Sequence, residues 1–211
     1  MRENTRDIPI HRDYYDLGFN MYKKNKIRFK TGITVLCGCN GAGKTTLLRQ
    51  LREYLKKEKI PHTYFDNLTD GGQNSRQKAG ALQDFKFLIP ATLSSEGENI
   101  IMNIERLSYE IGKFIANGSI DSSERWILLD AVDSGLSVDN ICELKEDLFE
   151  TIFEYDGDKY DIYIIVVANE YEMARGEQCF DVYNGKYITF KDYEEYRDFI
   201  IKSRELKNKR N

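Results

Sequence analysis

Short apolar runs alternate with amphipathic segments along most of the chain, a pattern typical of an α/β domain. The runs with the length and apolar content of buried strands are Ile33–Cys37, His62–Asp66, Trp126–Leu129 and Ile162–Ala168. Because parallel strands need long crossover connections, usually helical ones, the alternation predicts a mainly parallel sheet flanked by helices.

Apolar residues recur every three to four positions between these runs and predict helices. One helix begins at about Lys44, a second runs from about Gly97 to Ala116, and a third carries Ile141, Leu144, Leu148 and Ile152. A last helix is expected after Asp192, because Glu195 stands three residues further on and completes a capping box.

The two ends of the chain have the alternating pattern and turn residues of antiparallel strands. The expected N-terminal pair is Leu17–Tyr22 with Ile27–Phe29, and the expected C-terminal hairpin is Cys179–Tyr183 with Lys186–Phe190 around Asn184 and Gly185. Together these features predict one domain over residues 1–211, with an antiparallel N-terminal β lobe and a basic C-terminal helix or tail over about 192–211.

Composition narrows the class of protein. The chain has 211 residues, 41% of them hydrophobic and 31% charged, as in ordinary globular proteins, and a net charge of −4 gives no global attraction to nucleic acid. No apolar run approaches the ~20 residues of a membrane span, and the polar start has no signal-peptide pattern. The 4 cysteines and 2 histidines do not form a zinc-binding pattern. We therefore expect a cytoplasmic protein that is not inserted in a membrane.

The strongest motif is a glycine-rich loop between the first buried strand and the helix that follows it. Its sequence is Gly38-Cys39-Asn40-Gly41-Ala42-Gly43-Lys44-Thr45-Thr46. In such a loop the backbone N–H groups surround a phosphate, and the lysine reaches the β- and γ-phosphates. The positive end of the helix adds to the attraction. This loop predicts binding of ATP or a closely related nucleoside triphosphate.

A bound triphosphate normally carries Mg²⁺, which needs protein oxygen ligands. The Thr45 hydroxyl is one candidate. The second is Asp130, which ends the hydrophobic strand Trp126–Leu129.

These residues resemble the ATP-binding cassette ATPases, and the resemblance extends from about Leu17 to Phe190. Ser94–Glu98 is similar to the signature motif of that family, and Ser134–Ser137 is similar to its D-loop. Asn169 stands where the family has its switch histidine. Ser95 and Glu98 also fit a capping box, an interpretation compatible with the signature because a signature serine lies at a helix N-terminus.

The resemblance implies a head-to-tail dimer that holds two ATP molecules between its protomers, formed with itself or with a related subunit. Lys44, Thr45 and Asp130 of one protomer would face Ser95 and Gly97 of the other. Gln73 is the candidate for the family's Q-loop glutamine.

Two departures from the family pattern concern hydrolysis. Ala131 stands where a glutamate usually polarises the attacking water, and Asn169 replaces the histidine. Asp133 or Glu170 could substitute, although each also fits a structural or solvated role. The candidate catalytic set is therefore Lys44, Asp130, Asp133 and Asn169, and slow or conditional hydrolysis is expected.

The interval between Lys44 and Ser95 is short for a transporter cassette with a full helical arm. It favours a stand-alone ATPase similar to the SMC- and RecF-like heads and to mobile-element or defence ATPases, acting through an unidentified protein partner. A transporter subunit and a P-loop small-molecule kinase are the alternatives. The basic segment Lys202–Arg210 leaves open a nucleic-acid contact that the net charge does not indicate.

Overall fold

The computed structural model describes residues 4–66, 96–117 and 122–209, which form an α/β fold around a mainly parallel sheet. Its strand order is β4-β5-β6-β3-β7-β8, and every neighbouring pair is parallel except β7 with β8. The strands are β3 (Gly32–Cys37), β4 (His62–Asp66), β5 (Glu124–Asp130), β6 (Asp161–Val167), β7 (Gln178–Asp181) and β8 (Lys186–Ile188). A separate antiparallel pair consists of β1 (Thr5–Pro9) and β2 (Lys26–Lys30).

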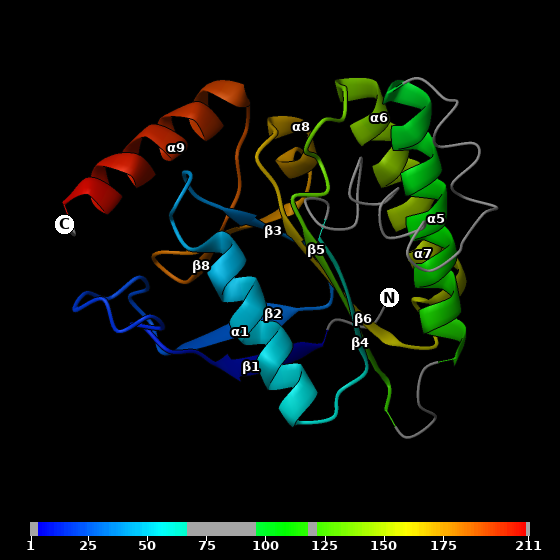
Figure 1. Ribbon diagram of the computed structural model, residues 1–211, viewed down its shortest axis with the longest axis horizontal. Helices are drawn as coiled ribbons and strands as arrows, with labels where there is room; N and C mark the ends of the chain where they lie inside the picture. Colours follow the sequence, from blue (N-terminus) through cyan, green and yellow to red (C-terminus); the bar gives the residue numbers. More distant parts are fainter. Residues whose placement is uncertain (1–3, 67–95, 118–121, 210–211) are drawn as a thin grey trace.

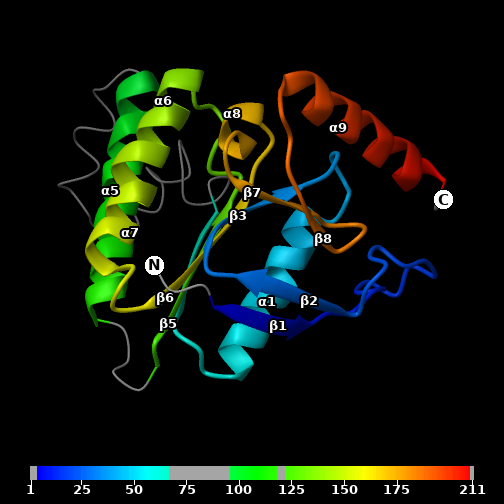
Figure 2. The same cartoon turned by 180° about the vertical axis from the view of Figure 1, so that it is seen from behind.

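Helices and the small sheet cover the two faces of the main sheet (Figures 1 and 2). Helix α1 (Lys44–Lys57) and the β1–β2 pair lie on one face. The other face carries α5 (Glu96–Asn117), α6 (Val138–Glu143), the π-helical segment η1 (Leu144–Glu150), α7 (Thr151–Asp156) and α8 (Tyr171–Ala174). The last helix, α9 (Tyr193–Asn208), runs beside the carboxyl end of β3.

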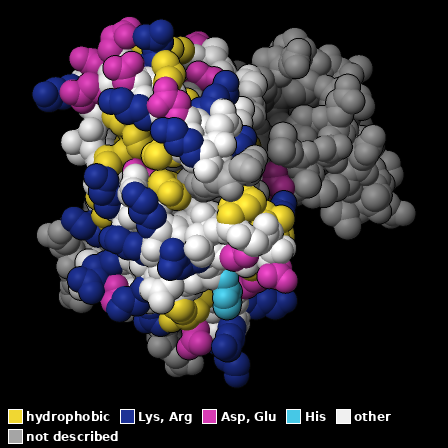
Figure 3. All heavy atoms as spheres, turned by 90° about the vertical axis from the view of Figure 1, so that its left-hand side faces the viewer, with side chains coloured by type: hydrophobic (Ala, Val, Ile, Leu, Met, Phe, Trp, Pro, Cys, Tyr) yellow, Lys and Arg dark blue, Asp and Glu magenta, His cyan; other side chains and the backbone are white. Residues whose placement is uncertain are grey.

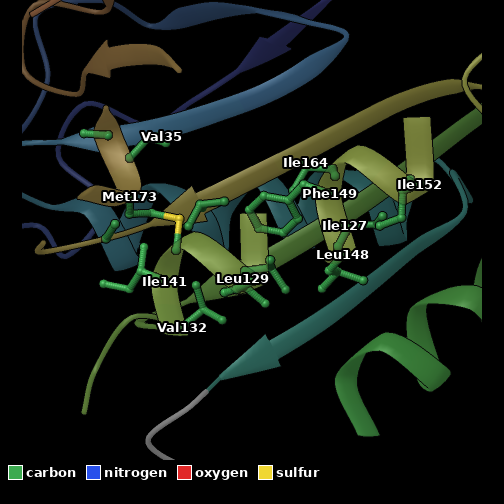
Figure 4. Packing of buried hydrophobic residues seen from close by; sticks show 14 of the residues in the cluster. Val35, Ile127, Leu129, Val132, Ile141, Leu148, Phe149, Ile152, Ile164 and Met173 are labelled. Atoms are coloured by element: carbon green, nitrogen blue, oxygen red, sulfur yellow. The ribbon is translucent and has the colours of Figure 1, made fainter. Parts of the chain in front are cut away.

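Alternating side chains of the central strands divide the core into two layers, as strand geometry requires. In β5, Ile127 and Leu129 join the layer under α5 to α8, whereas Trp126 and Leu128 join the layer under α1. Figure 4 shows the first layer, where Leu148, Phe149 and Ile152 meet Ile127 and Ile164 of the sheet. Because both faces of β5 and β6 are covered, these strands are apolar almost throughout.

The parallel strands and the main helices confirm the sequence prediction, but the N-terminal lobe differs from it. Strand β2 is present, whereas Leu17–Tyr22 is not a strand, and β1 is the partner of β2. The Asp13 carboxylate accepts bonds from the backbone N–H groups of Leu17 and Gly18, at 2.8 and 3.1 Å, which folds the segment into a loop.

Two local features of the C-terminal half also differ from the prediction. The β7–β8 hairpin pairs Asp181 with Lys186, so its loop has the residues 182–185 instead of a two-residue turn. The Asp181 carboxylate stabilises this longer loop by accepting the backbone N–H groups of Tyr183 and Asn184, each at 3.1 Å. The helix predicted around Ile141 contains the π-helical segment η1, whose wider turn allows Leu148 and Phe149 both to be buried.

None of the helices in the described part of the chain has the length and apolar character that a membrane span requires.

Candidate nucleotide-binding site

The loop between β3 and α1 has the backbone conformation that its glycines predict. Gly38, Gly41 and Gly43 have φ values of 154°, 77° and 100°, in the left-handed region that favours glycine. A Cβ atom on Gly43 would lie 2.9 Å from Met21 Cε and 3.0 Å from the Tyr22 hydroxyl, so this position also lacks room for a side chain. The loop therefore depends on glycine for both conformation and packing.

Lys44 lies inside the loop with 8% of its surface exposed. Its Nζ donates a 2.7 Å hydrogen bond to the Gly38 carbonyl oxygen. Burial lowers the pKa of the Lys44 ammonium by desolvating its charge, while the nearby ionisable groups, Asp133 and Asp130 among them, oppose this shift. Since the N-terminus of α1 adds a second positive contribution, the loop is arranged to receive an anion.

Thr45 and Asp130 meet beside Lys44, because α1 begins where β5 ends. Thr45 Oγ1 donates to Asp130 Oδ1 at 3.1 Å, and the Tyr64 hydroxyl approaches Asp130 Oδ2 at 3.4 Å. Burial raises the pKa of the Asp130 carboxyl, and the repulsion of Asp66 adds to this shift. The adjacent hydroxyl and carboxylate oxygens fit the ligand preference of Mg²⁺, which binds to proteins through few oxygen ligands and keeps phosphate or water in the other positions.

A pocket of about 330 Å³ opens at this point. Residues of the loop and the start of α1 line one wall: Cys39, Asn40, Gly41, Gly43, Lys44, Thr45 and Thr46. The opposite wall comes from the loop preceding β2 and from the ends of β5 and β6, with Met21, Asp130, Ala131, Ser134, Val167 and Asn169. Most of the predicted site residues therefore share one pocket. Gly38 and Ala42 lie behind it, since both are buried and a Cβ on Gly38 would be 2.9 Å from Ala42 Cβ.

Asp133 is not part of this pocket wall and is only 1% exposed. Its Oδ2 accepts the backbone N–H groups of Asn169 and Glu170 at 2.6 and 2.7 Å. Its Oδ1 is buried and has no hydrogen-bond partner among the described residues. The observed contacts of Asp133 thus hold the chain that leaves β6, and through it the position of Asn169.

Ala131 and Asn169 face the pocket at the ends of β5 and β6. Ala131 has a φ of 53°, and its N–H donates to the Val167 carbonyl at 3.0 Å. The backbone of Asn169 is fixed from a second side by the Tyr196 hydroxyl, which donates to its carbonyl oxygen at 2.9 Å. A methyl group and an amide, neither of which can act as a general base, therefore line the pocket at the ends of these two strands.

The structure adds residues that the sequence patterns did not identify. The Tyr22 hydroxyl donates a hydrogen bond to the Gly43 carbonyl oxygen at 2.8 Å and so helps to hold the end of the loop in place. From α9, Ser203 Oγ accepts the Cys39 N–H at 3.1 Å, and Lys207 Nζ donates to the Asn40 carbonyl oxygen at 3.1 Å. Cys39 and Ser203 are 164 residues apart in the chain, and no local sequence signal identifies a contact over that distance.

The predicted signature and Q-loop positions are outside the described pocket. Gln73 and Ser95 lie outside the described residues, and Gly97 lies in the first turn of α5. Their contacts with nucleotide therefore stay predictions.

The chain matches a known protein family over most of its length. A family model described as an AAA domain matches residues 17–210. Among solved structures, the ADP conformation of MJ1267, an ATP-binding cassette of an ABC transporter, matches with 13% identity, a TM-score of 0.47 and coverage of 99% of both chains. A search of curated proteins gave no match. Because the family model covers nearly the whole chain and includes the phosphate loop, the protein belongs to the AAA-domain family of P-loop ATPases.

Proposed function

We propose that this P-loop ATPase binds ATP with Mg²⁺, dimerises when ATP is bound, hydrolyses it slowly and passes the change in association to a protein partner. The observation that carries the proposal is the meeting of Lys44, Thr45 and Asp130 at one pocket with Ala131 on its wall. The first three residues supply tight binding of a triphosphate, whereas the fourth cannot supply general base catalysis.

Binding begins with the exchange of one hydrogen-bond acceptor for another. The Lys44 ammonium leaves the Gly38 carbonyl oxygen and donates to oxygens of the β- and γ-phosphates, which carry far more negative charge. The loop amides and the α1 N-terminus complete the contacts. Thr45 and Asp130 would hold Mg²⁺, which neutralises charge on the phosphates when it is bound. Because Lys44 is buried, an anion beside its ammonium would offset the cost of desolvating that charge.

Slow hydrolysis follows from the side chains around the expected γ-phosphate position. The wall contains the carboxylate of Asp130, which would bind Mg²⁺, and no second acidic residue among its described members. Asp133 is buried and accepts two backbone N–H groups, and Glu170 is exposed at the start of α8. A water molecule beside the γ-phosphate would thus lack a positioned base, and ATP would persist in the site.

Dimerisation on ATP would supply the contacts that one protomer lacks. Asn40, Gly41 and Asn169 are exposed at the rim of the pocket, so a bound triphosphate would stay accessible from outside. We propose that Ser95 and Gly97 of a second protomer cover this opening, because a serine at a helix N-terminus is suited to an anion. The partner protomer is a second copy of this chain or a related subunit.

The test is the solution mass of the protein with and without ATP and Mg²⁺, together with phosphate release. We expect a dimer that forms only with ATP and whose lifetime is much longer than the turnover time of an ordinary enzyme. A monomer at saturating ATP would contradict the gated association. Phosphate transfer to a small molecule in place of water would identify a kinase.

A further inference from the structure

Helix α9 contacts both walls of the nucleotide pocket. Near its start, Tyr196 donates to the Asn169 carbonyl oxygen. One turn before its end, Ser203 accepts the Cys39 N–H, and in the last turn Lys207 donates to the Asn40 carbonyl oxygen. Figure 1 shows the helix beginning near α8 and running past the loop that precedes α1.

The three contacting residues lie on one face of α9, because their spacings of about seven and four residues match whole turns of an α-helix. At a rise of about 1.5 Å per residue, Tyr196 and Lys207 are roughly 16 Å apart along the axis. Helix α9 therefore connects the phosphate loop to Asn169 through three hydrogen bonds along one face.

Lys207 also places a positive charge at the exposed turn of the loop formed by Asn40 and Gly41. Its ammonium is so close to the loop that a Cβ on Gly41 would lie 2.9 Å from Nζ. The side chain is half-buried and does not line the pocket itself. Its charge lies against the peptide segment of Asn40 and Gly41, so it adds to the positive field of the loop.

We propose that α9 positions the phosphate loop, with Ser203 and Lys207 as positioning residues, and thereby sets the affinity of the site for nucleotide. Ser203 fixes the Cys39–Asn40 turn by satisfying a buried N–H, and it is itself only 8% exposed. Lys207 fixes the adjacent carbonyl and supplies charge. The inference rests on the proposed ATP binding and adds that the C-terminal helix regulates it.

The charge arm of the test compares Lys207→Ala, Lys207→Arg and Arg204→Ala in ATP–Mg²⁺ titrations of the full chain. Many Lys and Arg side chains lie on the face where α9 ends (Figure 3), so a matched control is needed, and Arg204 is exposed on the same helix. We expect Lys207→Ala to weaken ATP binding about threefold to tenfold and to flatten its salt dependence, while Lys207→Arg and Arg204→Ala stay within about twofold of wild type. Equal losses for Lys207→Ala and Arg204→Ala, or no loss for Lys207→Ala, would overturn the proposal.

The hydrogen-bond arm uses Ser203→Ala and Ser203→Thr. Alanine leaves the Cys39 N–H unsatisfied and should weaken ATP binding, whereas threonine keeps the acceptor and should restore most of it. One outcome separates the two claims: wild type binds ATP, Lys44→Ala abolishes binding, and Lys207→Ala and Ser203→Ala both leave it unchanged. In that case the role of α9 is wrong and the proposed function stands. If wild type does not bind ATP, the proposed function itself fails.

Discussion

Ala131→Glu should convert a slow ATPase into a faster one. Ala131 faces the pocket at the end of β5, next to the Mg²⁺ candidate Asp130. Its φ of 53° is left-handed already, so glutamate adds no new class of backbone strain relative to alanine. A glutamate side chain at this position would extend into the pocket of about 330 Å³ that Ala131 lines.

The expected gain follows from the chemistry of the missing group. A positioned carboxylate typically accelerates a proton transfer by 10²–10⁴-fold, or about 3–5 kcal/mol of barrier. An added glutamate without evolved positioning should at most reach the lower limit of this range, so we expect roughly tenfold to hundredfold faster phosphate release. The lifetime of the ATP-bound dimer should fall in proportion to the increase in the rate of hydrolysis.

The assay is steady-state phosphate release at saturating ATP–Mg²⁺, with Ala131→Gln as the control of equal size that cannot accept a proton. The competing account assigns the base to Asp133 or Glu170. In that case Ala131→Glu changes little, whereas Asp133→Asn or Glu170→Gln abolishes turnover. Brisk wild-type turnover that survives loss of both acids would refute both accounts.

Two further predictions concern association and metal binding. Ser95→Arg should spare ATP affinity of the monomer and block the ATP-dependent dimer in sedimentation experiments; normal dimerisation would limit Ser95 to a helix cap. Burial raises the pKa of the Asp130 carboxyl in the folded protein. Its contribution to folding stability is therefore complete below the pKa of the unfolded chain, where the carboxyl is protonated in both states, and is lost as pH rises through the folded pKa. Asp130→Asn should therefore raise the Tm of the nucleotide-free protein at neutral pH while weakening Mg²⁺-dependent ATP binding; a lower Tm would contradict the burial argument.

Local patterns were sufficient to predict the centre of the fold. The apolar run before Gly38 and the leucine stripe after Lys44 predict β3 and α1 directly, and the glycine spacing fixes the loop between them. Asp130 follows from the same logic, because the carboxyl ends of parallel strands meet at one edge of the sheet. The short-range chemistry of strand, loop and helix therefore determines most of the phosphate-binding wall.

Contacts between distant segments were beyond sequence reasoning. The alternation in Leu17–Tyr22 suggests a strand, but the Asp13 carboxylate and the packing of Tyr22 under Gly43 impose a loop. The buried role of Asp133 depends on the backbone of residues 169 and 170. The contact of Ser203 with Cys39 depends on the whole sheet being assembled. In each case the local sequence pattern allows more than one conformation or contact, and the tertiary structure determines which one forms.

The central claim, triphosphate binding through the phosphate loop, is tested most directly by calorimetric titration of ATP–Mg²⁺ into wild type, Lys44→Ala and Lys57→Ala. Lys57 is the control because it is exposed in the last turn of the same helix. Wild type and Lys57→Ala should bind alike. Lys44→Ala should bind at least about tenfold more weakly, a loss of about 1.4 kcal/mol or more. Equal affinity of the folded Lys44→Ala variant would contradict the account.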